Sequence, residues 1–168
     1  MSTKKTIYQR KILRQLYFEN VLSCSDLSER IEKSIPLTTK MLSELISEGS
    51  VIETGLAPST GGRRPLMYSI KPDILYIVSV AMDQFVTRIA IMDMQNRFVS
   101  PVKTFDLPLA NNHDALQLLA AALKNCIEES GIDQKKIAGI GIGMPGFIDM
   151  QKGLNYSFLE TGQLNISD

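Results

Sequence analysis

Three glycines near the end of the chain have the spacing that most directly suggests chemistry. Gly141, Gly143 and Gly146 fit the pattern G-x-G-x-x-G, which in dinucleotide-binding proteins lets the backbone approach a pyrophosphate. That chemistry also needs a helix directly after the glycines, because the helix N-terminus receives the phosphates. Here Pro145 lies inside the motif, and FIDMQKGLNYS follows it without helical periodicity. We therefore expect a glycine-containing strand that ends in a Pro-Gly turn, and not a nucleotide cradle.

The segment GGRRP, residues 61–65, contains residue types that suit a nucleic acid. Gly61 and Gly62 let the backbone come close to a surface, and two adjacent arginines suit a narrow, strongly negative minor groove. We expect Gly62, Arg63 and Arg64 to contact DNA. The alternative is a solvated hairpin tip with no such role.

A helical pattern in residues 34–48 predicts a helix that reads a DNA groove. Met41, Leu42, Leu45 and Ile46 form its buried stripe, with Thr38 one turn earlier. Thr39 and Ser43 on the outward face could reach base edges or phosphates, and Lys40 could bind phosphate. We expect the DNA contacts to come from Pro36, Thr39, Lys40 and Ser43. Ile35 and Leu37 are apolar on this side, where they either meet thymine methyl groups or pack against the wing or a partner.

The first 72 residues supply the elements that must position these side chains. The first helix carries apolar residues at helical spacing, Ser25 is expected to cap a short second helix, and Ser34 caps the third, which ends at Gly49. Two strand-like segments, SVIETG and LMYSI, flank the GGRRP loop and predict a hairpin wing. Three helices and a wing make a winged helix-turn-helix, although a plain three-helix bundle for protein contacts is the alternative. The apolar residues of the first helix are Ile7, Leu13, Leu16, Tyr17 and Val21.

Beyond Pro72 the pattern changes to that of an α/β domain, which we expect over residues 73–168. ILYIVSVAMD, VTRIAIMDM and RFVSPVKTFDL read as strands. A helix over 115–130 follows, with Gly131 at its end, and then a buried strand over 137–142. The helix residues expected to face the core are Leu116, Leu119, Leu123 and Ile127.

Composition describes a soluble, core-forming protein. Of 168 residues, 44% are hydrophobic and 21% are charged, and no apolar run reaches the ~20 residues of a membrane span. We expect no signal peptide, a cytoplasmic location and no membrane partner. Cys24 and Cys126 read as reduced thiols, and His113 as a surface or capping residue.

Charge differs between the two predicted domains. Residues 1–72 carry 11 Lys and Arg against 7 Asp and Glu, whereas residues 73–168 carry 7 against 11. The asymmetry indicates that the first part meets a polyanion, with a chance scatter of surface charge as the alternative.

Two stretches resemble the ROK family of sugar-responsive repressors and sugar kinases. They are SIPLTTKMLSELISEGSVIETG followed by STGGRRP, and IAGIGIGMPGFID followed by a glycine and YS. The resemblance implies an N-terminal winged helix joined to an actin-like ATPase (ribonuclease H-like) domain, of which only the first part is expected here. Kinases of this family carry a D-x-G-x-T phosphate turn between the first two strands. At the matching positions this chain has Ala81, Asp83 and Phe85, so we expect no phosphoryl transfer and no enzyme activity.

The resemblance also implies an effector site at the Pro-Gly turn. Carried over, Gly143, Pro145, Gly146 and Asp149 line one wall of a sugar pocket, whereas the alternative is that they only shape a β-turn. The segment Tyr156 to Leu159 lacks the family's asparagine, which leaves the sugar open. The family's catalytic Asn-Asp pair and its zinc site would lie beyond Asp168, so we assign no catalytic residue, no metal and no cofactor.

These observations predict a DNA-binding transcriptional regulator of carbohydrate-metabolism genes, a repressor, that responds to a sugar or sugar phosphate. Its expected partners are double-stranded DNA, the carbohydrate and a second copy of itself, in a homodimer or a larger homo-oligomer. The alternatives are a ROK sugar kinase with an accessory winged helix and a winged-helix module that binds protein.

Overall fold

The computed structural model describes residues 4–59, 64–110, 112–149, 151–152 and 154–158. These form two compact units. The first contains residues up to Leu75 together with Asp93–Arg97, and the second contains Tyr76–Met92 and the chain from Phe98 onward. The change of unit therefore comes three residues after the expected boundary at Pro72. The short turn Asp93–Arg97 belongs to the first unit, although the chain on either side of it belongs to the second.

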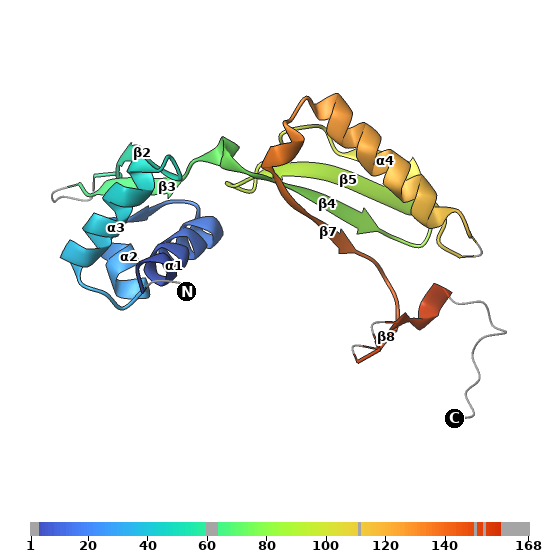
Figure 1. Cartoon of the computed structure of the whole chain (residues 1–168), viewed down its shortest axis with the longest axis horizontal. Coiled ribbons are helices and arrows are strands. Elements are labelled where there is room, and N and C mark those ends of the chain that lie inside the picture. Colours follow the sequence, from blue (N-terminus) through green and yellow to red (C-terminus); the bar gives the residue numbers. More distant parts are fainter. Residues whose placement is uncertain (1–3, 60–63, 111, 150, 153, 159–168) are drawn as a thin grey trace. The chain divides into compact units, whose positions relative to one another are not determined.

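The first unit is built from three helices and a small antiparallel sheet (Figure 1). In the sheet, β3 lies between β1 and β2 and pairs antiparallel with both. The elements are α1 (Lys4–Glu19), β1 (Leu22–Ser23), α2 (Cys24–Arg30), α3 (Ile35–Ser47), β2 (Val51–Leu56), β3 (Leu66–Ile70) and the 3-10 turn η1 (Pro72–Ile74).

The core of the first unit joins one face of each helix to the sheet. Ile12 and Leu16 are the most buried residues of α1. They belong to the same core as Leu27 of α2 and Leu42 of α3. The expected stripe on α1 is partly wrong, because Ile7 and Val21 are exposed and Ile12 was not included. The remaining buried apolar residues of this core are Leu22, Ile31, Met41, Leu45, Val51 and Ile70.

The second unit is a four-stranded sheet in the order β6-β5-β4-β7, with α4 across one face (Figure 1). Strands β5 and β6 are antiparallel, whereas β4 and β7 are parallel. After β7 the chain forms a short hairpin and a 3-10 turn. The elements are β4 (Tyr76–Met82), β5 (Val86–Asp93), β6 (Lys103–Asp106), α4 (Ala115–Ser130), η2 (Gln134–Lys136), β7 (Ile137–Gly143), β8 (Ile148–Asp149), β9 (Leu154–Asn155) and η3 (Tyr156–Phe158).

The bounds of α4 and its end at Gly131 agree with the expectation from the sequence. One of the residues expected to face the core does not do so. Gly131 takes a left-handed φ of 68°, as a glycine helix end commonly does. Leu119 and Cys126 are buried against Val78, Val80, Ile89 and Ile91 of the sheet. Leu116, however, is 77% exposed.

The expectation of a buried strand at 137–142 is wrong in its burial. β7 is an edge strand of the described sheet, with Ile140 and Ile142 each about half exposed. No helix follows it in the described residues up to 149, which agrees with our rejection of a dinucleotide fold. Apolar sequence predicted the strand correctly, but it could not tell a covered strand from an edge.

Candidate nucleic-acid interface

Helix α3 separates its residues into an inner and an outer face. Thr38, Met41, Leu42 and Leu45 are at most 4% exposed and belong to the interior of the first unit. The four residues expected to contact DNA are exposed on the other side, and their spacing places them on successive turns of one helix face. They are Pro36, Thr39, Lys40 and Ser43. Leu37, by contrast, packs partly against the core.

Two hydroxyls and one ammonium group give this face its chemistry. Ser43 Oγ donates to the backbone oxygen of Thr39 at 3.0 Å, and Thr39 Oγ1 lies 3.3 Å from Cys24 Sγ. Each hydroxyl has two lone pairs and therefore keeps hydrogen-bonding capacity for a ligand. Lys40 makes no ion pair with any residue that the structure describes. The face can thus bind an anionic, hydrogen-bonding surface.

Neighbouring cations are engaged within the protein instead. Lys5 pairs with Glu44 at 3.1 Å, and Arg30 pairs with Glu19 at 2.6 Å. Lys33 donates to Glu32 O and lies 5.2 Å from the centre of the Tyr8 ring. Among the described residues, Lys40 differs from these cations in having no ion pair, no side-chain hydrogen bond and no ring contact.

A capping box holds α2, and through it the position of α3. Ser23 Oγ accepts from Asp26 N at 3.2 Å, while Ser23 N donates to Asp26 Oδ2 at 3.1 Å. The expected cap at Ser25 is wrong, because Ser25 lies two residues too late to reach the first free amides. Hydrogen bonds from the Ser23 side chain and backbone lower the pKa of Asp26.

The junction between α2 and α3 is tight. Lys33 N donates to Ser28 O at 3.0 Å, and Glu32 takes a left-handed φ of 56°. At the start of α3, Ser34 is the N-cap residue by its backbone angles, and Thr38 Oγ1 donates to Ser34 O at 3.1 Å. These contacts fix the start of α3, where Pro36 lies, relative to α2.

The base of the β2–β3 hairpin is held by Arg64. Its Nε donates to Ala57 O at 2.5 Å, its Nη2 donates to Leu56 O at 3.3 Å, and Ala57 N donates to Pro65 O at 2.9 Å. Part of this guanidinium is therefore used inside the hairpin, which the sequence did not reveal. Gly62 and Arg63 lie outside the described residues.

The residues expected to bind the effector lie at the end of β7 and in the segment that follows it. Gly143 pairs with Ala81, and Gly146 has a φ of 145° in the turn that Pro145 begins. Asp149 Oδ1 accepts from Gln151 N at 2.9 Å and Lys152 N at 3.0 Å. These two amides, Lys152 first, lower the pKa of Asp149. The carboxylate thus closes the β8–β9 turn.

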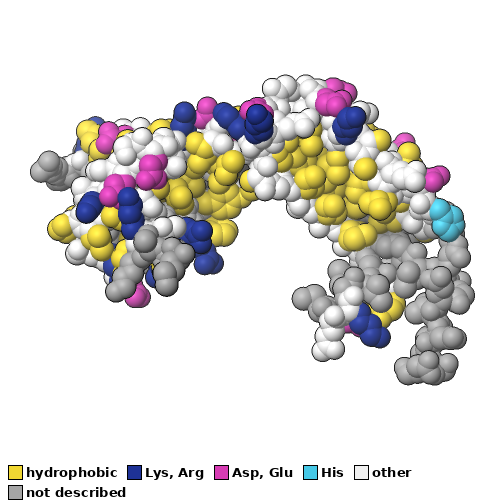
Figure 2. Space-filling model, in the orientation of Figure 1, with side chains coloured by type: hydrophobic (Ala, Val, Ile, Leu, Met, Phe, Trp, Pro, Cys, Tyr) yellow, Lys and Arg dark blue, Asp and Glu magenta, His cyan; other side chains and the backbone are white. Residues whose placement is uncertain are grey.

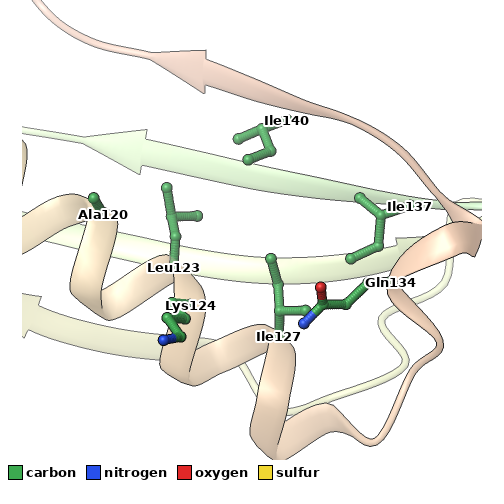
Figure 3. Close-up of a pocket in the computed structure, with 7 residues that line it drawn as sticks. All are labelled: Ala120, Leu123, Lys124, Ile127, Gln134, Ile137 and Ile140. Atoms are coloured by element: carbon green, nitrogen blue, oxygen red, sulfur yellow. The ribbon is translucent and has the colours of Figure 1, made fainter.

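Two apolar hollows beside α4 do not include any of these four residues. The larger, of about 460 Å³, lies between α4 and β7, with Ile127 and Ile140 on opposite sides (Figure 3). The second, of about 280 Å³, is lined by Met82, Leu119 and Ile142 among others. Figure 2 shows exposed apolar side chains gathered on the second unit. The expected effector residues are therefore not part of either hollow.

Asp83 lies in the turn between β4 and β5, where the sequence resemblance predicted the counterpart of the kinase phosphate turn. Its Oδ1 accepts from Phe85 N at 2.9 Å and from Val86 N at 2.7 Å, and its Oδ2 lies 3.2 Å from Arg88 Nη1. These hydrogen bonds, Phe85 first, lower the pKa of Asp83. The amides that could cradle a phosphate are thus bound by the protein's own carboxylate.

Comparisons with known proteins support the resemblance seen in the sequence. The chain is 25% identical over 158 residues to a xylose repressor of Caldicellulosiruptor bescii, covering 89% of this chain. A relative from Caldicellulosiruptor sp. (strain Rt8B.4) is also 25% identical, over 150 residues. The chain spans 37% of the length of these curated relatives. No family model matches the chain.

The fold of the chain resembles part of a solved structure. A crystal structure of a ROK family transcriptional regulator, a homologue of the E. coli MLC protein, matches 90% of this chain and 38% of its own, with a TM-score of 0.59 and 18% identity. The expected ROK resemblance is therefore confirmed.

In the part of the chain that the structure describes, no helix is long and apolar enough to cross a membrane.

Proposed function

We propose that this chain, which resembles the ROK regulators in sequence and in fold, is a DNA-binding transcriptional repressor that responds to a sugar. The observation that carries the proposal is the outward face of α3, where Thr39, Lys40 and Ser43 are exposed together above a buried apolar face. The names of the two curated relatives, "Xylose repressor" and "Putative xylose repressor", support the same function.

The first unit would bind DNA as a winged helix. α3 is 13 residues long and fits a major groove, where Thr39 and Ser43 would meet base edges and Lys40 a phosphate. The β2–β3 hairpin is the wing, and Arg64 stiffens its base through the carbonyls of Leu56 and Ala57. Arg63 would then carry the minor-groove contact beyond that base.

The second unit would receive the effector as part of an actin-like domain. Its sheet has two neighbouring parallel strands, β4 and β7, and ligands of open α/β sheets bind beyond the carboxyl ends of such strands. Gly143 is the last residue of β7, and Pro145, Gly146 and Asp149 follow it. We infer that they form one wall of a carbohydrate site, whose occupation changes the affinity of the first unit for DNA.

Catalysis is not part of the proposal. Phosphoryl transfer requires amides and a metal-holding carboxylate directed at the phosphates. At Asp83–Phe85 the carboxylate and the amides bind one another. A cytoplasmic homodimer on a pseudo-palindromic operator completes the proposed function, because two-fold protein symmetry matches two equivalent half-sites.

Fluorescence polarisation of the full chain on AT-rich and random duplexes tests the proposal. We expect binding at low salt, weaker binding of Lys40→Ala, and unchanged binding of Lys124→Ala, an exposed lysine of α4. Absence of binding by the folded chain at low salt would refute the DNA-binding function. Equal losses in the two lysine variants would refute the role of α3.

A further inference from the structure

The turn Asp93–Arg97 belongs to the first unit, although the strand that leads into it belongs to the second. β5 ends at Asp93, and residues 93–97 pack with the first unit, after which the chain returns to the second unit at Phe98. The chain therefore passes between the units at this turn as well as at Leu75–Tyr76. The turn is a second covalent connection between them.

Hydrogen bonds join the turn to elements that shape the proposed DNA-binding surface. Gln95 Nε2 donates to Ile70 O at 2.7 Å and to Ser69 Oγ at 3.1 Å, at the end of β3. Asn96 Nδ2 donates to Tyr17 O at 3.2 Å, in the last turn of α1, where helical carbonyls lack an intrahelical partner. Met94 N donates to Pro72 O at 3.2 Å.

The bonded end of β3 is part of the sheet of the first unit. Ile70 is 2% exposed and pairs with Val51 of β2, and Ser69 is 1% exposed. Met94 also packs partly against the core and lines an apolar hollow of about 270 Å³ with Leu13 and Tyr17 of α1. A shift of the turn would therefore reach both the hairpin strands and α1.

The turn is also rigid within itself. Asp93 is 4% exposed, and its Oδ1 accepts from Gln95 N at 2.8 Å and from Arg97 N at 3.0 Å. Arg97 Nε donates to Asp93 Oδ2 at 2.9 Å. Asp93 N donates to Arg97 O at 3.0 Å, and Met92 and Phe98 form a bridge directly behind the turn. A rigid turn transmits displacement of β5 better than a loose loop, because packed structure does not deform continuously.

We propose that the turn Asp93–Arg97 couples the second unit to the first, so that the state of the sheet alters DNA affinity through Gln95 and Asn96. This inference rests on the proposed function, since it requires the first unit to bind DNA. Coupling is reciprocal. DNA bound to the first unit must therefore stabilise the second unit, and this can be measured without knowing the sugar.

Cys126 offers the readout. It is 5% exposed on the inner face of α4 and belongs to the core of the second unit, so a thiol reagent reaches it only when that unit opens. Labelling is measured in the full-length Cys24→Ser chain, with and without saturating duplex, and polarisation confirms that each variant is bound. Cys24 is replaced because it lies beside Thr39 and would report the first unit.

We expect duplex to slow labelling of Cys126 by at least about fivefold, the lower end of ordinary allosteric coupling. In Gln95→Ala/Asn96→Gly the slowing should fall below about twofold, because the bonds to Ile70, Ser69 and Tyr17 are lost. Glycine suits position 96, where φ is 59°. Asn96→Gly alone should be intermediate, and it is the milder variant if the double variant folds poorly.

Gln84→Ala is the matched control, because Gln84 is an exposed glutamine in the β4–β5 turn, at the opposite end of β5 from Gln95. It should keep the full slowing. The coupling proposal is overturned if duplex slows labelling equally in the double variant and in the parent chain, or if it does not slow labelling in a parent chain that is bound. If the parent chain binds no duplex, the proposed function itself fails.

Discussion

Removing the hydroxyl of Ser23 should loosen the helix pair that presents the candidate DNA surface. Ser23 is 2% exposed, and its Oγ both accepts from Asp26 N and lies 2.6 Å from Asp26 Oδ2. Loss of an N-cap side chain costs about 0.5–2 kcal/mol. Because the site is buried and the cap is part of a reciprocal box, we expect Ser23→Ala to cost about 1–2 kcal/mol.

Amide hydrogen exchange in α2 and α3 measures this change separately for the first unit. A loss of about 1–2 kcal/mol makes exchange of the most protected amides about 5–30 times faster. Ser25→Ala is the comparison variant, because the Ser25 hydroxyl is exposed and touches the box only through Ser23 Oγ at 2.8 Å, so its loss should cost less than the loss of the cap itself. A larger effect at Ser25 than at Ser23 would refute the assignment of the cap.

The same box predicts a pH dependence. The pKa of Asp26 is lowered in the folded chain, so its contribution to stability is present above its ordinary pKa and is lost as pH falls through the lowered value. The difference between Ser23→Ala and the parent chain should therefore shrink in acid. A difference that grows below pH 4 would contradict this explanation.

Three further outcomes follow from the structure. Lys40→Ala should reduce the slope of log K against log salt by about one unit if Lys40 binds one phosphate; an unchanged slope would exclude that contact. Arg64→Lys should weaken duplex binding about as much as Arg64→Ala, because a lysine cannot reproduce the fork that binds Leu56 O and Ala57 O; full retention of binding by Arg64→Lys would show that charge alone matters. ATP with D-xylose should give no phosphorylation above background, because Asp83 engages the amides of its turn; robust turnover would overturn the non-catalytic interpretation.

Local patterns predicted most of the elements in both units. The α3 stripe followed from helical spacing, and the end of α4 followed from Gly131. The true cap of α2 was also visible locally, since Ser23 and Asp26 have the S-x-x-D spacing of a capping box. Choosing Ser25 overlooked that spacing.

The failures concern features that depend on distant parts of the chain. The exposure of β7 depends on which strands lie beside it, and Ile140 and Ile142 read the same in an edge strand as in a central one. Gln95 and Asn96 were recognised only as a turn, because their partners Ser69 and Tyr17 are 26 and 79 residues away. The use of Arg64 within the hairpin was hidden for a different reason. A side chain's charge does not reveal which carbonyls it meets.

The central claim is that the outer face of α3 binds DNA, and amide chemical-shift mapping of the full chain during titration with a duplex tests it most directly. We expect the largest shifts at Thr39, Lys40 and Ser43, with smaller shifts along β2 and β3, and with the salt dependence of a charge-driven complex. Shifts concentrated on α4 and β7, with none on α3, would contradict the account.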